Sequence, residues 1–338
     1  MTSLPDDRLV LGVDGGNSKT DVAIANADGR LLALIGAGPT VSHQAVGIDE
    51  GIRRLAELVS AAREQAGLAA RDRIELGSFC LAGADTPADL RLLRGALADL
   101  GLVERTLIRN DTQAALRSGT DRGWGVVVIC GSGVNAHGVA PDGRHARLIA
   151  LGEVSGDWGG GTDMGWSALA AAVRGRDGRG PRTSLERRVP AAFGLRRPDT
   201  LSRALYADRI DPARLSELSP LVFATAADGD PVAREIVDRL ADEVVAMAGA
   251  MIRRLRLATT DVDVVLAGGV MATTFEPFHD RIRAGILELA PRARIVVPAA
   301  PPVLGAILIG LDSMVDRPVA ARITAAAGLR RAWPTPAR

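Results

Sequence analysis

Two stretches of this 338-residue chain repeat one pattern of strand, glycine turn, strand and Asp-Gly turn. The first, residues 13–30, reads VDGGNSKTDVAIANADGR, and the second, residues 129–144, reads ICGSGVNAHGVAPDGR. The turns follow one another at nearly equal spacing in both copies. Because an internal repeat indicates duplication of one structural unit, we expect two related domains that each begin with an antiparallel β-meander.

Apolar strands followed by amphipathic helices continue after each meander, and this alternation predicts an α/β fold. The predicted strands are 9–13, 20–24, 31–35, 76–82 and 105–109 in the first half, and 125–130, 135–139, 147–151, 262–267 and 295–297 in the second. The predicted helices include 49–66, 87–100, one that follows the glycine loop 156–161, 231–257 and 303–314. We expect one domain over 1–114, with a C-terminal helix at about 303–325 packing back on it, a second over 115–302, and a loose tail after Ala327.

Charge and composition exclude several classes of protein. The chain has 41 basic and 40 acidic residues, so no net field favours nucleic acid or an anionic membrane. The longest apolar tract, 297–311, contains three prolines and is shorter than the ~18 residues that a membrane-spanning helix needs. The start, MTSLPDDR, does not resemble a secretion signal, and two cysteines in apolar runs fit a reducing compartment. We expect a cytoplasmic protein without a zinc site, a membrane span or a nucleic-acid partner.

The first glycine turn, Asp14 to Thr20, is the sharpest local signal for chemistry. Its backbone N–H groups can surround a phosphate, its hydroxyls and Lys19 add donors, and Asp14 at the strand end can hold a hydrated Mg²⁺. The chain runs on into a strand, so this is not a P-loop. A plain hairpin turn remains the alternative. Lys19 is the only lysine among 41 basic residues, which favours the phosphate interpretation.

Three further segments carry weaker signals. The second turn, Gly131-Ser132-Gly133, is the counterpart of the first and can bind the same phosphates, or can be a simple hairpin. Gly268-Gly269, ahead of Thr273, can let a flat base approach the backbone, or can join a strand to a helix. The glycines at 156–161 admit a ligand or serve a turn with Asp157 as a cap.

Asn110-Asp111 stands where a strand ends and a helix begins. A carboxylate at that edge of an α/β sheet lies where ligands of such proteins bind. Aspartate is also a common N-cap, and this alternative stays open for Asp111.

Taken together, these motifs resemble the superfamily of acetate kinase, sugar kinases, heat-shock ATPases and actin. The order is DGGNSKT, Asn-Asp, ICGSGVNA and LAGGVM, and it covers about residues 9–312. Within the superfamily the chain is similar to the branch that holds N-acetylglucosamine kinase and the BadF-BadG-BcrA-BcrD ATPases, components of benzoyl-CoA reductase and hydroxyacyl-CoA dehydratase. The resemblance implies two ribonuclease H-like, actin-like ATPase domains with an interdomain nucleotide cleft.

The resemblance also implies roles for individual residues. Asp111 would be the catalytic base, Asp14 would organise Mg²⁺, and the 6-hydroxyl of N-acetylglucosamine or glucosamine would accept the phosphoryl group. ATP would contact Gly15, Gly16, Asn17, Ser18, Lys19, Thr20, Gly131, Ser132, Gly133, Gly268, Gly269 and Thr273. The sugar would contact Ser42, His43, Asp111, Val134, Asn135, Gly152, Glu153 and Asp157.

Two positions depart from the pattern of the amino-sugar kinases, and both concern the sugar rather than phosphoryl transfer. Ser42 stands where asparagine is common, and Trp158 replaces an acidic residue.

Three other functions occur in the superfamily, and the sequence argues against each. An activator ATPase needs cysteines at a subunit interface to hold an iron–sulfur cluster, and Cys80 and Cys130 lie in predicted strands. An actin- or chaperone-like module carries larger insertions than this chain has room for. The repressor-like glucokinases have a cysteine-rich zinc motif that is absent here. A kinase, expected to be a homodimer, is the preferred interpretation.

Overall fold

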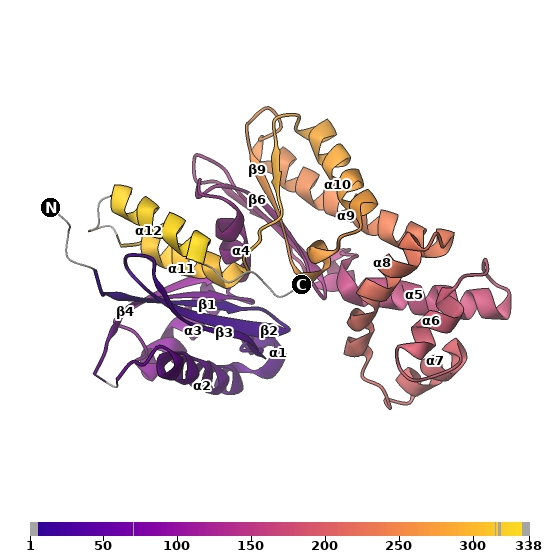
Figure 1. The fold of residues 1–338 in the computed structure, drawn as a ribbon, viewed down its shortest axis with the longest axis horizontal. Coiled ribbons are helices and arrows are strands. Elements are labelled where there is room, and N and C mark those ends of the chain that lie inside the picture. Colours follow the sequence, from indigo (N-terminus) through magenta and orange to yellow (C-terminus); the bar gives the residue numbers. More distant parts are fainter. Residues whose placement is uncertain (1–5, 70, 315, 317–318, 333–338) are drawn as a thin grey trace. The chain divides into compact units, whose positions relative to one another are not determined.

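The computed structural model describes residues 6–69, 71–314, 316 and 319–332 (Figure 1). They divide into two compact units: unit 1 lies within Met1–Gly123 and Pro298–Arg338, and unit 2 is Trp124–Val297. Each unit contains one five-stranded sheet with helices packed on it. The predicted α/β class is confirmed.

The sheet of unit 1 has the strand order β3-β2-β1-β4-β5. The first three strands form an antiparallel meander, and β4 and β5 continue the sheet in parallel with β1. The strands are β1 (Leu9–Gly15), β2 (Lys19–Asn26), β3 (Leu31–Pro39), β4 (Ile74–Leu81) and β5 (Arg105–Asn110), and the helices are α1 (His43–Val46), α2 (Ile48–Gln65), α3 (Pro87–Leu100), α4 (Asp111–Gly119), α11 (Pro302–Asp312) and α12 (Val319–Ala332).

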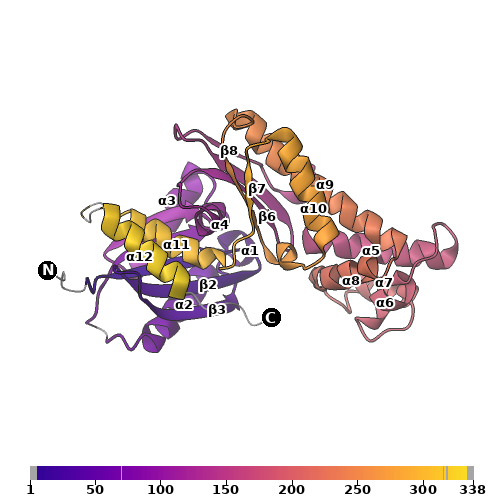
Figure 2. The same cartoon turned by 45° about the horizontal axis from the view of Figure 1, so that its top comes forward.

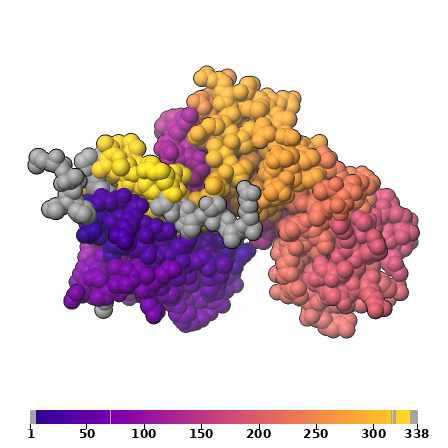
Figure 3. All heavy atoms as spheres, viewed as in Figure 1, coloured from indigo at the N-terminus to yellow at the C-terminus, as the bar shows by residue number. Residues whose placement is uncertain are grey.

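Alternation along β1 decides which helices cover each face of this sheet. Leu9, Leu11 and Val13 pack in one cluster with residues of α2 and α3. Val10 faces the other way and packs with α11 and α12, which cover the opposite face (Figure 1). Figure 3 shows α12, in yellow, at the surface of this unit.

The sheet of unit 2 has the order β10-β9-β6-β7-β8, in which β6, β7 and β8 form the antiparallel meander and β9 and β10 run parallel to β6. This is the connectivity of unit 1 a second time, which confirms the predicted duplication. The strands are β6 (Gly125–Cys130), β7 (Val134–Val139), β8 (His145–Arg147), β9 (Asp263–Ala267) and β10 (Arg294–Val296).

Helices α9 and α10 lie side by side in unit 2 (Figure 2), and α9 contacts β6, β7 and β8. Between β8 and α9 the chain forms a helical region of which only the start had been predicted. The helices of this unit are the 3₁₀ helices η1 (Gly152–Ser155), η2 (Pro212–Leu218) and η3 (Gly269–Ala272), and the α-helices α5 (Gly160–Asp177), α6 (Leu185–Ala191), α7 (Pro198–Tyr206), α8 (Ser219–Ala227), α9 (Pro231–Leu255) and α10 (Glu276–Leu289).

Three expectations differ from the structure. The division between the units falls after Gly123 rather than after Ala114, because α4 packs against α11 and β4 of unit 1. The strand predicted at 147–151 ends at Arg147, since Ala150 has a φ of 55° that extended backbone does not allow. The tail predicted to be loose forms α12 as far as Ala332, with Leu329 fully buried.

Candidate active site

The first glycine turn joins β1 to β2 at the edge of the sheet of unit 1. Gly15 pairs with Thr20, and the N–H of Gly16 donates to the carbonyl of Lys19 at 3.0 Å. Asn17, Ser18 and Lys19 are exposed at the tip. The structure therefore forms the hairpin turn that the sequence predicts and presents its polar tip to solvent.

Lys19 does not extend freely from this turn. Its Nζ lies 2.6 Å from Oδ2 of Asp21, which is buried, while the other oxygen of Asp21 accepts from the N–H of Ala37 at 2.7 Å. Asp21 was not identified from the sequence as a candidate residue. The available signal was its spacing of two residues from Lys19, which places both side chains on one face of β2.

Asp14 and Asp111 lie close enough for their charges to interact. Burial, together with the negative charges of Asp111 and Asp21, raises the pKa of Asp14 well above its usual value, and Lys19 opposes this effect. A nearby cation would stabilise the charged form of such a carboxylate. The donor set therefore fits Mg²⁺, which proteins bind through one or two carboxylates and substrate phosphates. Among the described residues, no group of three His, Cys, Asp or Glu side chains forms an all-protein metal site.

The start of α4 settles which residue caps it. Asn110 is the N-cap, and its Oδ1 accepts from the N–H of Thr112 at 3.1 Å. Its Nδ2 donates to Oδ1 of Asp85 at 2.7 Å. Asp111 is therefore the first residue of the helix and not its N-cap, although its Oδ1 also accepts from the N–H of Thr112 at 2.9 Å. Asp85, after β4, is a second residue that the sequence did not reveal.

Hydrogen bonds tie the segment that contains Ser42 and His43 to the first turn. The hydroxyl of Thr40 donates to the carbonyl of Gly16 at 2.8 Å, and the N–H of Ser42 donates to Oγ1 of Thr40 at 3.1 Å. Oγ of Ser42 and Nδ1 of His43 are buried, and neither has a hydrogen-bond partner among the described residues. Because buried polar atoms rarely lack partners, these two atoms are candidate ligand contacts.

In unit 2 the second turn rests on the start of α5. The N–H groups of Gly161 and Thr162 donate to the carbonyls of Gly131 and Ser132 at 2.8 and 2.9 Å. Gly160 has a φ of 79°, and a Cβ there would lie 2.6 Å from the carbonyl oxygen of Ser132. The glycine run at this position therefore allows α5 to support the turn, a role that the sequence could not separate from ligand binding.

Gly268 brings the end of β9 against the end of β6. Its φ is 102°, and a Cβ there would lie 2.3 Å from the carbonyl oxygen of Cys130. Gly269 begins η3, and Oγ1 of Thr273 accepts from the N–H of Phe275 at 3.3 Å. Gly268 is thus required for a close approach of backbone directly beside the second turn, whereas a Cβ on Gly269 would meet nothing within 4 Å.

The remaining predicted sugar contacts in unit 2 lie on β7 and in the segment around η1. Val134 and Asn135 begin β7, and Oδ1 of Asn135 is buried without a partner among the described residues. Gly152 and Glu153 are exposed in η1. Asp157 accepts from the N–H of Gly152 at 3.1 Å and from the hydroxyl of Ser155 at 2.5 Å, so it braces this segment.

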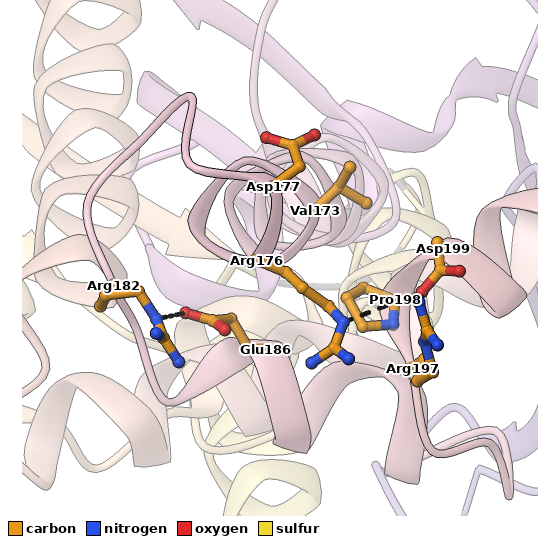
Figure 4. Close-up of a pocket in the computed structure, with 8 residues that line it drawn as sticks. All are labelled: Val173, Arg176, Asp177, Arg182, Glu186, Arg197, Pro198 and Asp199. Carbon is orange, nitrogen blue, oxygen red and sulfur yellow. Dashed lines mark hydrogen bonds and ion pairs between the residues drawn. The ribbon is translucent and has the colours of Figure 1, made fainter.

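A cavity of about 500 Å³ in unit 2 contains none of the predicted residues (Figure 4). Its charged side chains pair with one another: Arg182 with Glu186 at 2.7 Å, and Arg197 with Asp199 at 3.0 Å. This pairing leaves little charge for a ligand.

In the part of the chain that the structure describes, no helix is long and apolar enough to cross a membrane.

Comparisons with known proteins agree with this geometry. The chain is 28% identical over 304 residues to an N-acetylmuramic acid/N-acetylglucosamine kinase of Clostridium acetobutylicum, covering 89% of this chain and 98% of the relative. It is 28% identical over 317 residues to an N-acetyl-D-glucosamine kinase of Dictyostelium discoideum, covering 90% and 98%. A solved structure of a proposed N-acetylglucosamine kinase from Chromobacterium violaceum matches with a TM-score of 0.70 and 26% identity, covering 90% of this chain and 99% of that one.

The strand orders and these matches confirm the predicted pair of actin-like ATPase domains. The model of one family matches residues 11–310, nearly the whole chain. The chain therefore belongs to the BadF/BadG/BcrA/BcrD ATPase family.

Proposed function

We propose that this protein is a sugar kinase that transfers the γ-phosphoryl group of ATP to the 6-hydroxyl of N-acetylglucosamine or glucosamine. Membership of an ATPase family implies the use of ATP. The observation that carries the proposal is the position of the buried polar atoms without partners: Ser42 Oγ, His43 Nδ1 and Asn135 Oδ1 are all at predicted sugar contacts. A polyol supplies the hydroxyls that such atoms lack.

Phosphoryl transfer asks a protein mainly to position groups and to neutralise charge. Asp111, fixed at the start of α4 by the cap at Asn110, would orient the acceptor hydroxyl and take its proton. The N–H groups of the two glycine turns, with Lys19, would bind the phosphates of ATP. Asp14 would hold Mg²⁺, which neutralises phosphate charge when bound.

An ATPase activator of a CoA-ester dehydratase or reductase is the alternative within this family. Its iron–sulfur cluster needs thiolates. Burial raises the pKa of both Cys80 and Cys130 to about 12, which disfavours the thiolate at each position. A colourless protein whose ATP turnover depends on added sugar supports the kinase.

The same proposal includes a homodimer and a cytoplasmic location.

Sugar-dependent ATP consumption tests the function directly. We expect activity with N-acetylglucosamine or glucosamine and a lower kcat/KM with glucose, because a site built to hydrogen-bond a polar group discriminates strongly against analogues without it. N-acetylmuramic acid belongs in the panel because a relative is named for it. The phosphorylated position is read from the product by NMR. An absence of activity on every hexose and amino sugar would reject the proposal.

The substituent at C2 of the sugar depends on Ser42. Its hydroxyl is shorter than the asparagine common at this position and offers no amide to an acetamido group. A free amine would instead pair with Glu153, which is exposed in η1. The ratio of kcat/KM for glucosamine to that for N-acetylglucosamine decides between these acceptors.

Lys19→Ala is expected to raise the KM for ATP about tenfold or more, and to change the KM for the sugar less. The reason is the place of this cation at the tip of the first turn, where it can reach phosphate from its pairing with Asp21. Arg30→Ala, which removes an exposed cation at the other end of β2, is the matched control. An equal rise of both KM values would contradict the assignment.

A further inference from the structure

The ring of His43 lies between the loop after β4 and the first turn of α3 in unit 1. A Cβ on Gly83, after β4, would lie 2.7 Å from Cε1 of His43, so the absence of a side chain there makes room for the ring. Nε2 of His43 lies 3.7 Å from Oδ1 of Asp89, in the first turn of α3. Nδ1 is buried and has no partner in the described part of the chain. The two ring nitrogens therefore have different surroundings.

A capping box fixes the carboxylate of Asp89. Its Oδ2 accepts from the N–H of Thr86 at 2.8 Å and from the hydroxyl of Thr86 at 2.7 Å, and Oγ1 of Thr86 accepts from the N–H of Asp89 at 3.2 Å. The hydrogen bond from the Thr86 side chain lowers the pKa of Asp89. Oδ2 thus completes the capping box of α3, while Oδ1 faces His43.

The negative charge of Asp89 favours the tautomer of His43 that carries its proton on Nε2. The distance of 3.7 Å between Nε2 and Oδ1 is too long for a hydrogen bond, so this effect is electrostatic. A neutral imidazole has one donor and one acceptor. Nδ1 then carries the lone pair, and no donor to it is found in the described part of the chain. Resting on the proposed kinase function, we propose that Asp89 is a positioning residue that makes Nδ1 of His43 a hydrogen-bond acceptor for an O–H or N–H group of the sugar.

Ser42 adds a second group to the same contact. It occupies the N-cap position of α1, yet its side chain makes no capping hydrogen bond, and its hydroxyl is buried without a described partner. This hydroxyl can donate or accept, whereas Nδ1 of His43 only accepts. The pair therefore selects an acceptor with a hydroxyl, amine or acetamide N–H at this position and discriminates against an analogue that carries only an ether or hydrogen there.

Two substitutions of His43 separate its nitrogens. The amide of asparagine occupies about the place of Nδ1, and that of glutamine about the place of Nε2. We expect His43→Asn to keep most of the kcat/KM for the sugar and His43→Gln to lose about tenfold, with the KM for ATP unchanged in both. If His43→Gln retains as much activity as His43→Asn, Nδ1 is not the contact.

Asp89→Asn and Thr86→Ala separate positioning from helix capping. Both disturb the capping box, but Thr86→Ala keeps the charge of the Asp89 carboxylate and the hydrogen bond that it accepts from the N–H of residue 86. We expect Asp89→Asn to raise the KM for the sugar several-fold without changing the KM for ATP, and Thr86→Ala to lower stability alone. Equal KM values for the sugar in the two variants would overturn the positioning role.

The tautomer can be measured without any substrate. The chain has four histidines, so the ¹⁵N signals of His43 can be assigned by substitution. We expect the Nε2–H tautomer in the wild type and a shift toward Nδ1–H in Asp89→Asn. A wild-type protein with the Nδ1–H tautomer overturns this inference whatever the enzyme does. A wild-type protein with the Nε2–H tautomer that phosphorylates none of the sugars overturns instead the proposed function and, with it, the role of Nδ1 in binding sugar.

Discussion

Asp111→Asn is expected to bind MgATP with near-normal affinity and to lose phosphoryl transfer by about 10²- to 10⁴-fold, the contribution of a general base. The substitution leaves the fold of α4 intact, because Asn110 is the cap and an asparagine Oδ1 can still accept from the N–H of Thr112. The loss should therefore appear in kcat, measured under saturating ATP and sugar.

Asp49→Asn is the matched control for this variant, since Asp49 is an exposed carboxylate in the first turn of another helix, α2. We expect it to keep wild-type turnover. Should Asp111→Asn retain more than about a tenth of the wild-type rate, the role of general base is wrong and the carboxylate serves the helix terminus instead.

Gly305→Ala is expected to lower the free energy of unfolding by about 1–3 kcal/mol through overpacking. Gly305 is buried in α11, where a Cβ would lie 1.9 Å from the carbonyl oxygen of Ala114 in α4. That oxygen belongs to a packed helix backbone and cannot turn aside as a side chain can. Urea denaturation followed by circular dichroism measures the change.

The same substitution in α3 should have the opposite sign. Gly95 is exposed, and a Cβ there meets nothing within 4 Å. Gly95→Ala is therefore expected to raise the free energy of unfolding by about 0.5–1 kcal/mol, because alanine has the higher helix propensity. Two destabilised variants, or two stabilised ones, would show that the contact between α11 and α4 does not set the stability at residue 305.

Elements that a local pattern specifies could be predicted closely. The α3 and β6 boundaries agree with the structure, at Pro87–Leu100 and Gly125–Cys130. The Thr86 cap with Pro87 marks the start of that helix, and a continuous apolar run marks that strand. The third strand of the second meander, predicted at 147–151, ends at Arg147 in β8, and the positive φ of Ala150 that follows has no local sequence signal such as glycine.

Short helices of unit 2 were harder to predict. Helices α6, α7 and α8 have seven or nine residues each, too few turns for a clear periodicity. The part of α12 after Ala327 was expected to be a loose tail, yet it buries Leu329 against unit 1. Its formation depends on that packing rather than on its own sequence, as is usual for short helices in water.

The sequence by itself determined the duplicated meander and the two glycine turns, because turn and strand preferences act over a few neighbouring residues. Only the tertiary structure decided what surrounds each candidate side chain. In the structure Lys19 pairs with buried Asp21, Asn110 is the N-cap of α4, and Asp89 faces His43. The partners that hold these side chains come from other segments: Ala37 of β3 donates to Asp21, Asn110 donates to Asp85 after β4, and Asp89 of α3 faces His43 of α1. Such contacts exist only when the fold brings separate segments of the chain together.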